Sequence, residues 1–149
     1  MNNCFDIAKK FIELSNKDSI PMSPMKLLKL TYIAHGYYLA FTDKPLFENK
    51  IEAWKYGPVI PDLYHIIKRV DFSNNDFKFI EMYSQNNLSK EDSKFIETVW
   101  GAYNRFDGSQ LSSKTHEKGT PWYKTYNGQS FTQINNELIK EYYKNKVNG

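Results

Sequence analysis

The chain has 149 residues, enough for one domain that buries roughly two-thirds of its unfolded surface without disulfides. Its 20 basic residues nearly balance its 17 acidic ones, and a net charge of +3 does not give the basic face typical of nucleic-acid-binding proteins. Its single cysteine, Cys4, excludes an internal disulfide, and no apolar run approaches the roughly 20 residues that span a bilayer. We therefore expect a cytoplasmic protein with one domain over residues 1–149, whose ends fray near residues 1–3 and 147–149.

Helical spacing of apolar residues dominates the first part of the chain. The pattern predicts a first helix over residues 3–15. Ser23 and Pro24 have the features of an N-cap followed by proline at the first helical position, so a second helix is predicted over 24–42. This helix is apolar on most faces, which predicts a central position in the fold. Gly36 costs about 1 kcal/mol relative to alanine in a helix interior, and close packing is the expected compensation.

The stretch 52–64, EAWKYGPVIPDLY, predicts a stiff corner. Its two prolines fix φ near about −65°, and Gly57 can adopt backbone angles closed to other residues. Trp54 and Tyr56 combine a large apolar area with one polar group each, which suits either packing against a core or contact with a partner. The residues alone leave both roles open.

Short extended segments and helices are predicted around and after this corner. Residues 51–54 are predicted to be extended or a strand, and Pro61 is placed to begin a short helix that ends near residue 70. Imperfect alternation over 77–83 predicts a strand that pairs with 51–54 in a small hairpin. Ser89 begins a capping-box-like sequence, which predicts a helix whose apolar face extends to Phe106.

The last third of the chain is predicted to contain three helices. Ser109 is predicted to cap a short helix that ends near residue 117, with Gly119 closing it in a left-handed conformation. Thr120 and Pro121 then begin a second short helix, and 135–146 forms the last one. The predicted fold class is mainly α, a single compact bundle of about five to six helices with at most a small β-hairpin.

The chain carries no recognisable catalytic motif. Its three histidines, His35, His65 and His116, lie far apart in sequence, and none has a second ligand at metal-binding spacing. A structural role for His116, capping carbonyl groups at a helix end, is favoured over a hydrolase that pairs it with an acid such as Glu117. Cys4 has no activating neighbours in sequence. We expect no enzyme activity and no catalytic, cofactor-binding or metal site.

Three blocks of the chain together resemble the Panacea domain family, which includes SocA-like antitoxins and phage-associated GepA-type proteins. The blocks are KLLKLTYIAHGYYLAFTDKPLF, EAWKYGPVIPDLY and LSSKTHEKGTPW, and the resemblance covers about residues 5–143. The family is understood as a versatile antitoxin domain, in which related domains neutralise unrelated toxins encoded beside them. The resemblance implies a helical binding protein that forms a complex with one cognate toxin encoded nearby and has no reaction of its own.

The resemblance also marks a set of motif residues, as scaffold or as toxin contact. They are Trp54, Tyr56, Gly57, Pro58, Pro61, Tyr64, Thr115, His116, Pro121 and Trp122. Because one domain that meets unrelated toxins should keep its framework constant, a scaffold role is favoured for Trp54, Gly57 and Pro58.

Two other functions stay open at this point. One SocA-like relative is an adaptor that delivers its toxin to the Clp protease, so this protease is a possible second partner. A sequence pI of 8.8 and abundant aromatic residues also leave a nucleic-acid-binding regulator as an alternative, although nucleic acid is not the expected partner. No membrane partner is expected.

Overall fold

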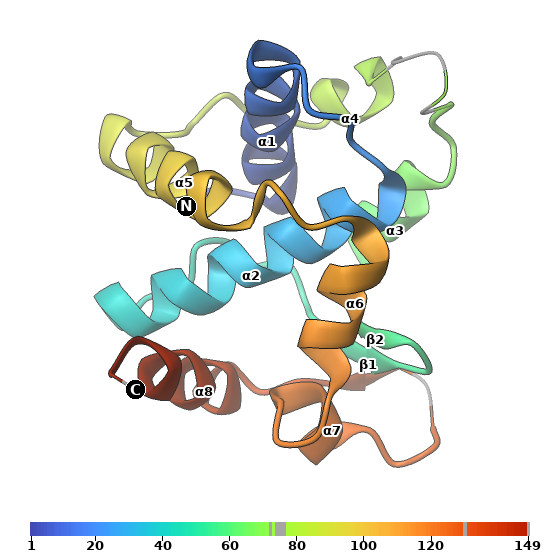
Figure 1. The fold of residues 1–149 in the computed structure, drawn as a ribbon, viewed down its shortest axis with the longest axis vertical. Helices are drawn as coiled ribbons and strands as arrows, with labels where there is room; N and C mark the ends of the chain where they lie inside the picture. Colours follow the sequence, from blue (N-terminus) through green and yellow to red (C-terminus); the bar gives the residue numbers. More distant parts are fainter. Residues whose placement is uncertain (72, 74–76, 130, 149) are drawn as a thin grey trace.

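The structure is a computed structural model that describes residues 1–71, 73, 77–129 and 131–148. Within these ranges the chain forms eight α-helices and a small three-stranded sheet, which confirms the predicted mainly α class (Figure 1). The helices are α1 (Cys4–Asp18), α2 (Pro24–Thr42), α3 (Pro61–Ile67), α4 (Lys78–Met82), α5 (Lys90–Tyr103), α6 (Gly108–His116), α7 (Pro121–Thr125) and α8 (Asn136–Asn148). The strands are β1 (Glu52–Trp54), β2 (Gly57–Val59) and β3 (Thr132–Gln133).

The central helix is α2, as its apolar sequence predicts. In Figure 1 it crosses the middle of the molecule, with α1 and α5 on one side and α8 on the other. It begins as predicted, because the Ser23 side chain accepts a hydrogen bond of 3.2 Å from the Lys26 amide and Pro24 is the first helical residue. No helix of the described chain is long and apolar enough to cross a bilayer.

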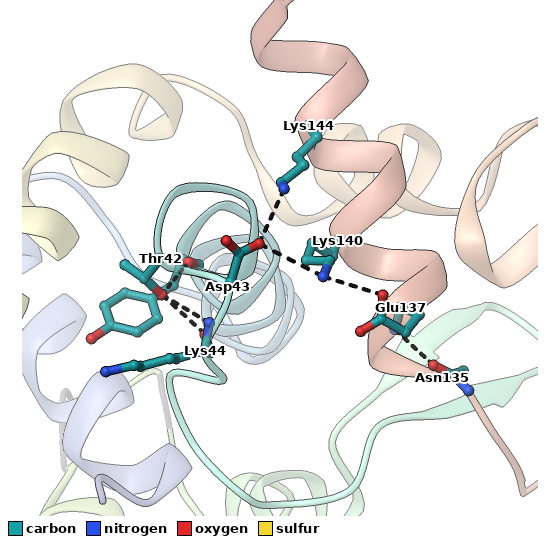
Figure 2. A network of polar contacts seen from close by, with 8 residues as sticks. Thr42, Asp43, Lys44, Asn135, Glu137, Lys140 and Lys144 are labelled. Atoms are coloured by element: carbon teal, nitrogen blue, oxygen red, sulfur yellow. Dashed lines mark hydrogen bonds and ion pairs between the residues drawn. The ribbon is translucent and has the colours of Figure 1, made fainter.

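Besides a hydrogen bond of 3.1 Å between His35 Nε2 and Asn136 Oδ1, two kinds of contact attach α8 to α2. The first is close packing of the buried Tyr143 ring against the backbone at Gly36. The second is a surface network, shown in Figure 2, in which the Asp43 carboxylate lies 3.0 Å from Lys144 Nζ and 3.6 Å from Lys140 Nζ. Solvent screens exposed ion pairs, so the buried ring contributes more to this attachment than they do.

Side-chain caps set where the other long helices begin. Ser89 caps α5 as predicted, by accepting a hydrogen bond from the Asp92 amide. The prediction that Ser109 caps α6 is wrong. Asp107 is the N-cap, and it forms a reciprocal capping box with Gln110 at 2.8 and 2.9 Å. The carboxylate and the amide satisfy two backbone donors together, which a single serine hydroxyl at 109 cannot do.

The sheet differs from the predicted hairpin in its partners. Strand β1 lies in the centre, paired antiparallel with β2 on one side and with β3 on the other. The predicted strand over 77–83 is wrong, because 78–82 forms α4. The buried residues there are Phe77 and Ile80, and this spacing of three residues fits a helix that covers the core with one face.

Substituting the two glycines that lie inside long helices should change stability in opposite directions. A Cβ at Gly36 would lie 2.3 Å from two carbons of the Tyr143 ring, whereas a Cβ at Gly101 in α5 meets no atom within 4 Å. We predict that Gly36→Ala lowers the free energy of unfolding by about 1–3 kcal/mol through overpacking. Gly101→Ala should raise it by about 0.5–1 kcal/mol through helix propensity.

Urea unfolding of both variants measures this difference directly. A Gly36→Ala protein that matches Gly101→Ala in stability would mean that α8 does not pack on α2 as described.

Candidate functional site

The predicted stiff corner is a two-residue β-hairpin that leads directly into α3. Trp54 pairs with Gly57 across the turn, and Lys55 and Tyr56 form the loop between them. Gly57 has φ of +123°, a conformation that L side chains rarely adopt. We call residues 52–64 the corner.

A buried lysine from α2 joins the corner to the central helix. Lys29 is 1% exposed, and its Nζ donates a hydrogen bond of 2.8 Å to the carbonyl oxygen of Pro58. Proline has no N–H, so the carbonyl is the backbone polar group that Pro58 can offer. Pro58 lies in β2, an edge strand, where proline is tolerated. Burial lowers the pKa of Lys29 from 10.5 to about 7.

Helices α6 and α7 hold the other side of the hairpin through its carbonyl groups. Ser112 Oγ donates to the Tyr56 carbonyl at 3.3 Å, and Trp122 Nε1 donates to the Trp54 carbonyl at 2.6 Å. The His116 side chain lies between these two contacts, close to Gly57 and edge-on to the Trp122 ring at 5.4 Å between centroids. The sequence blocks 52–64 and 111–122, far apart in the chain, thus form one assembly.

The chemistry around His116 and Cys4 is that of structural side chains. His116 Nδ1 donates to the Ser112 carbonyl in the same helix, as expected for a histidine that caps carbonyl groups. Among the described residues, no carboxylate contacts His116 to complete a hydrolytic pair. Cys4 is fully buried in α1, and burial raises the pKa of its thiol, so the reactive thiolate is disfavoured. The described chain contains no cluster of three His, Cys, Asp or Glu residues that could hold a metal ion.

An apolar groove of about 470 Å³ lies between the corner, α2 and α3, and we call it the corner groove. Its lining comprises Met25, Leu28, Lys29, Trp54, Lys55, Tyr56, Val59, Tyr64, His65 and Phe131. The Trp54 ring meets the rings of Tyr64 and Phe131 edge-on at 5.0 and 5.3 Å. Tyr56 and Phe131 are each 67% exposed, so two large rings face solvent beside a pocket.

Two lysines lie beside aromatic rings of the corner groove. Lys55 Nζ lies 5.4 Å from the Tyr56 ring centroid, and Lys68 Nζ lies 5.7 Å from that of Tyr64. Its lining includes no carboxylate. The nearby Glu52 carboxylate accepts the Trp54 indole N–H at 3.0 Å. Such a surface suits a ligand with apolar side chains in the groove and acidic groups at its edge.

The motif residues fall into three classes of exposure. The buried ones are Gly57, Pro58, Thr115 and Pro121; the half-buried ones are Trp54, Pro61, Tyr64, His116 and Trp122; and Tyr56 is exposed. Sequence reasoning did not find Lys29, Met25 or Phe131. Lys29 could have been found from the sequence, because it is a charged residue on a helix with apolar residues on most faces. Phe131 follows a turn, and no sequence pattern indicates its role.

Comparison with known proteins places these features in a family. Residues 27–123 match the family described as "Antitoxin SocA-like, Panacea domain". "Antitoxin SocA" from Caulobacter vibrioides (strain NA1000 / CB15N) is 32% identical over 135 residues, which cover 82% of this chain and 69% of that protein. No solved structure matches the chain. The family match includes the corner, α6 and the first part of α7, but not Met25 or Phe131.

The close approach of Lys29 to Gly57 can be tested by comparing Gly57→Ala with the same substitution at another glycine of positive φ. A Cβ at Gly57 would lie 2.9 Å from Lys29 Nζ, whereas one at Gly119, with φ of +91°, meets no atom within 4 Å. Relieving the clash would move Lys29 and leave the Pro58 carbonyl without its partner. Gly57→Ala should therefore cost about 1–3 kcal/mol of unfolding free energy more than Gly119→Ala. Equal losses, measured by urea unfolding, would mean that Lys29 does not occupy this position.

The buried amine also predicts a pH dependence of stability. Because the pKa of Lys29 is about 7 in the folded chain and 10.5 is its ordinary value, the unfolded chain binds more protons between these pH values. Stability therefore rises with pH there, by up to about 1.4 kcal/mol per pH unit from this group.

We predict that Lys29→Met removes this contribution. At each pH, the unfolding free energy of the Lys29→Met protein is subtracted from that of the unmodified chain. The contributions of the other titrating groups cancel in this difference, which should increase with pH above about 7. The exposed Lys44→Met serves as the matched control and should keep the original dependence. Parallel pH profiles for all three proteins would contradict a buried, neutral amine.

Proposed function

This chain belongs to the SocA-like antitoxin family that carries the Panacea domain, and we propose that it neutralises a cognate protein toxin by direct complex formation. We further propose that the toxin binds in the corner groove. The observation that carries this proposal is the pair of solvent-facing rings, Tyr56 and Phe131, beside an apolar pocket on a hairpin held by three other elements.

Rigidity of the corner supports its use for binding. Backbone carbonyls at Trp54, Tyr56 and Pro58 are each fixed by a side chain from another helix. A surface that is already ordered loses less conformational entropy when a partner binds. Tyrosine and tryptophan in such positions often provide a large share of the affinity of a protein interface.

The surroundings of the groove define the chemistry of the toxin surface that fits it. Apolar side chains would fill the pocket beside Met25 and Tyr64. Carboxylates at the edge would meet Lys55 and Lys68, which both lie over aromatic rings of the groove. We therefore expect the bound face of the toxin to be apolar at its centre and acidic at its rim.

Co-expression with the product of the neighbouring gene tests the proposal. We predict that the unmodified chain restores growth and co-purifies with the toxin, and that Tyr56→Ala and Phe131→Ala each weaken the complex by about tenfold or more. Tyr123→Ala is the matched control, since Tyr123 is 51% exposed on α7 and does not line the groove. Tyr56→Ala and Tyr123→Ala should keep the unfolding free energy within about 0.5 kcal/mol, because surface substitutions rarely change it more. Phe131→Ala also loses its edge-on contact with Trp54, so about 1 kcal/mol is expected there.

Several results would contradict direct neutralisation. A neighbouring protein that is not toxic alone, or that stays toxic in the presence of the unmodified chain, removes the proposal in this form. Toxin that disappears only in cells with Clp protease would favour the adaptor function instead. If the complex forms but Tyr123→Ala weakens it as much as Tyr56→Ala does, direct neutralisation stands and the corner groove is not its binding site.

A further inference from the structure

A second apolar groove lies at the other end of α2 from the corner. It has a volume of about 390 Å³, and the side chains that form most of its walls are Tyr37, Phe41, Phe95, Val99, Tyr103 and Phe106. We call it the α2–α5 groove. Met25 of the corner groove and Tyr37 are separated by about 18 Å along the helix axis, at about 1.5 Å per residue. The two grooves share no lining residue and are therefore separate surfaces.

The walls of the α2–α5 groove follow helical spacing. Phe95, Val99 and Ala102 recur along one stripe of α5, and Tyr37 and Phe41 lie one turn apart on α2. The hydroxyl groups of Tyr37 and Tyr103 are hydrogen-bonded at 2.6 Å, which fixes the two walls relative to each other. Phe41 is 62% exposed, so part of this apolar surface faces solvent.

Two cations lie at one end of this groove. The Arg105 guanidinium and the Lys114 ammonium both lie 4.5 Å from the centroid of the Phe106 ring. In the described part of the chain, neither cation forms an ion pair with a carboxylate. Both contribute to the lining of the groove. The apolar groove thus ends in two positive charges that pair with no acidic side chain among the described residues.

We propose that the α2–α5 groove binds an amphipathic helix of a partner protein, with carboxylates in the last turn of that helix. A helix fits because both walls are helical stripes, into which side chains at i, i+3 or i+4, and i+7 can pack. The orientation follows from charge, since a helix C-terminus carries partial negative charge and added carboxylates strengthen it. Arg105 and Lys114 would meet that end, while apolar residues of the bound helix cover Phe41 and Phe95. This inference does not depend on the proposed toxin site, because it uses a different surface.

A pair of synthetic peptides tests the proposal on the purified chain without any toxin. The first is a fluorescein-labelled helix of about four turns, with leucines along one stripe and two glutamates in its last turn. The second carries lysines in place of the two glutamates. Fluorescence anisotropy should show that the acidic peptide binds at least about tenfold more tightly than the basic one. Added salt should reduce this ratio of affinities, because it screens the charges.

Variants of the chain connect this preference to the groove. The double variant Arg105→Glu and Lys114→Glu should bind the basic peptide more tightly than the acidic one. Phe106→Ala should lower the affinity for both peptides by about tenfold. Lys94→Glu is the matched control, because Lys94 is exposed on the same helix α5 but does not line the groove. It should leave both affinities unchanged. Urea unfolding verifies that each variant is folded.

Other results overturn the proposal. The acidic helix is not the ligand if the two peptides bind with equal affinity or if neither binds. It is also not the ligand if the charge-reversal variant still binds the acidic peptide more tightly than the basic one. Light scattering that shows a dimer dissociated by the charge reversal would assign the groove to a second copy of the chain. Anionic lipid vesicles that bind the chain and displace the peptide would assign it to a membrane surface.

Discussion

The hydrogen bond between Lys29 Nζ and the Pro58 carbonyl joins the central helix to the hairpin, and the site at the corner depends on it. Burying an amine is costly unless its polar atoms find partners, and here desolvation shifts the pKa of Lys29 toward neutrality. The contact also restricts the hairpin. Gly57 must lack a Cβ because Nζ occupies the adjacent space, and its positive φ is open to glycine. A lysine, a glycine and a proline together determine how the corner meets α2.

The exposed rings of the corner groove follow from this fixed hairpin. With its carbonyls held by Lys29, Ser112 and Trp122, the hairpin has few alternative positions in which Tyr56 could turn into the core. The side chain stays two-thirds exposed. Many motif residues, including Gly57, Pro58 and Thr115, are buried and support the backbone, whereas Tyr56 points outward. The same motif therefore contains both buried residues and an exposed ring.

Local signals predicted most of the helices. Apart from the N-cap of α6, which is Asp107 and not Ser109, the failures occurred where long-range contacts decide the structure. Ser23, Ser89 and Thr120 cap the helices that they were expected to cap, because a cap acts on its own next few residues. The segment 77–83 has a short apolar pattern that fits a strand or a helix, and packing against the core selects the helix. The candidate site was located through its motif residues. Its key amine and Phe131 were missed, since their partners lie 29 and 77 residues away, at Pro58 and Trp54.

Hydrogen–deuterium exchange of the chain with and without its cognate toxin would show whether the corner groove is the toxin-binding face. If the toxin binds in the corner groove, it should slow exchange of the amides in residues 54–57 and 131–133. Exchange along α5 should stay the same. Protection confined to α5 or α8, with unchanged exchange at the hairpin, would contradict it and would leave the corner as a purely structural element.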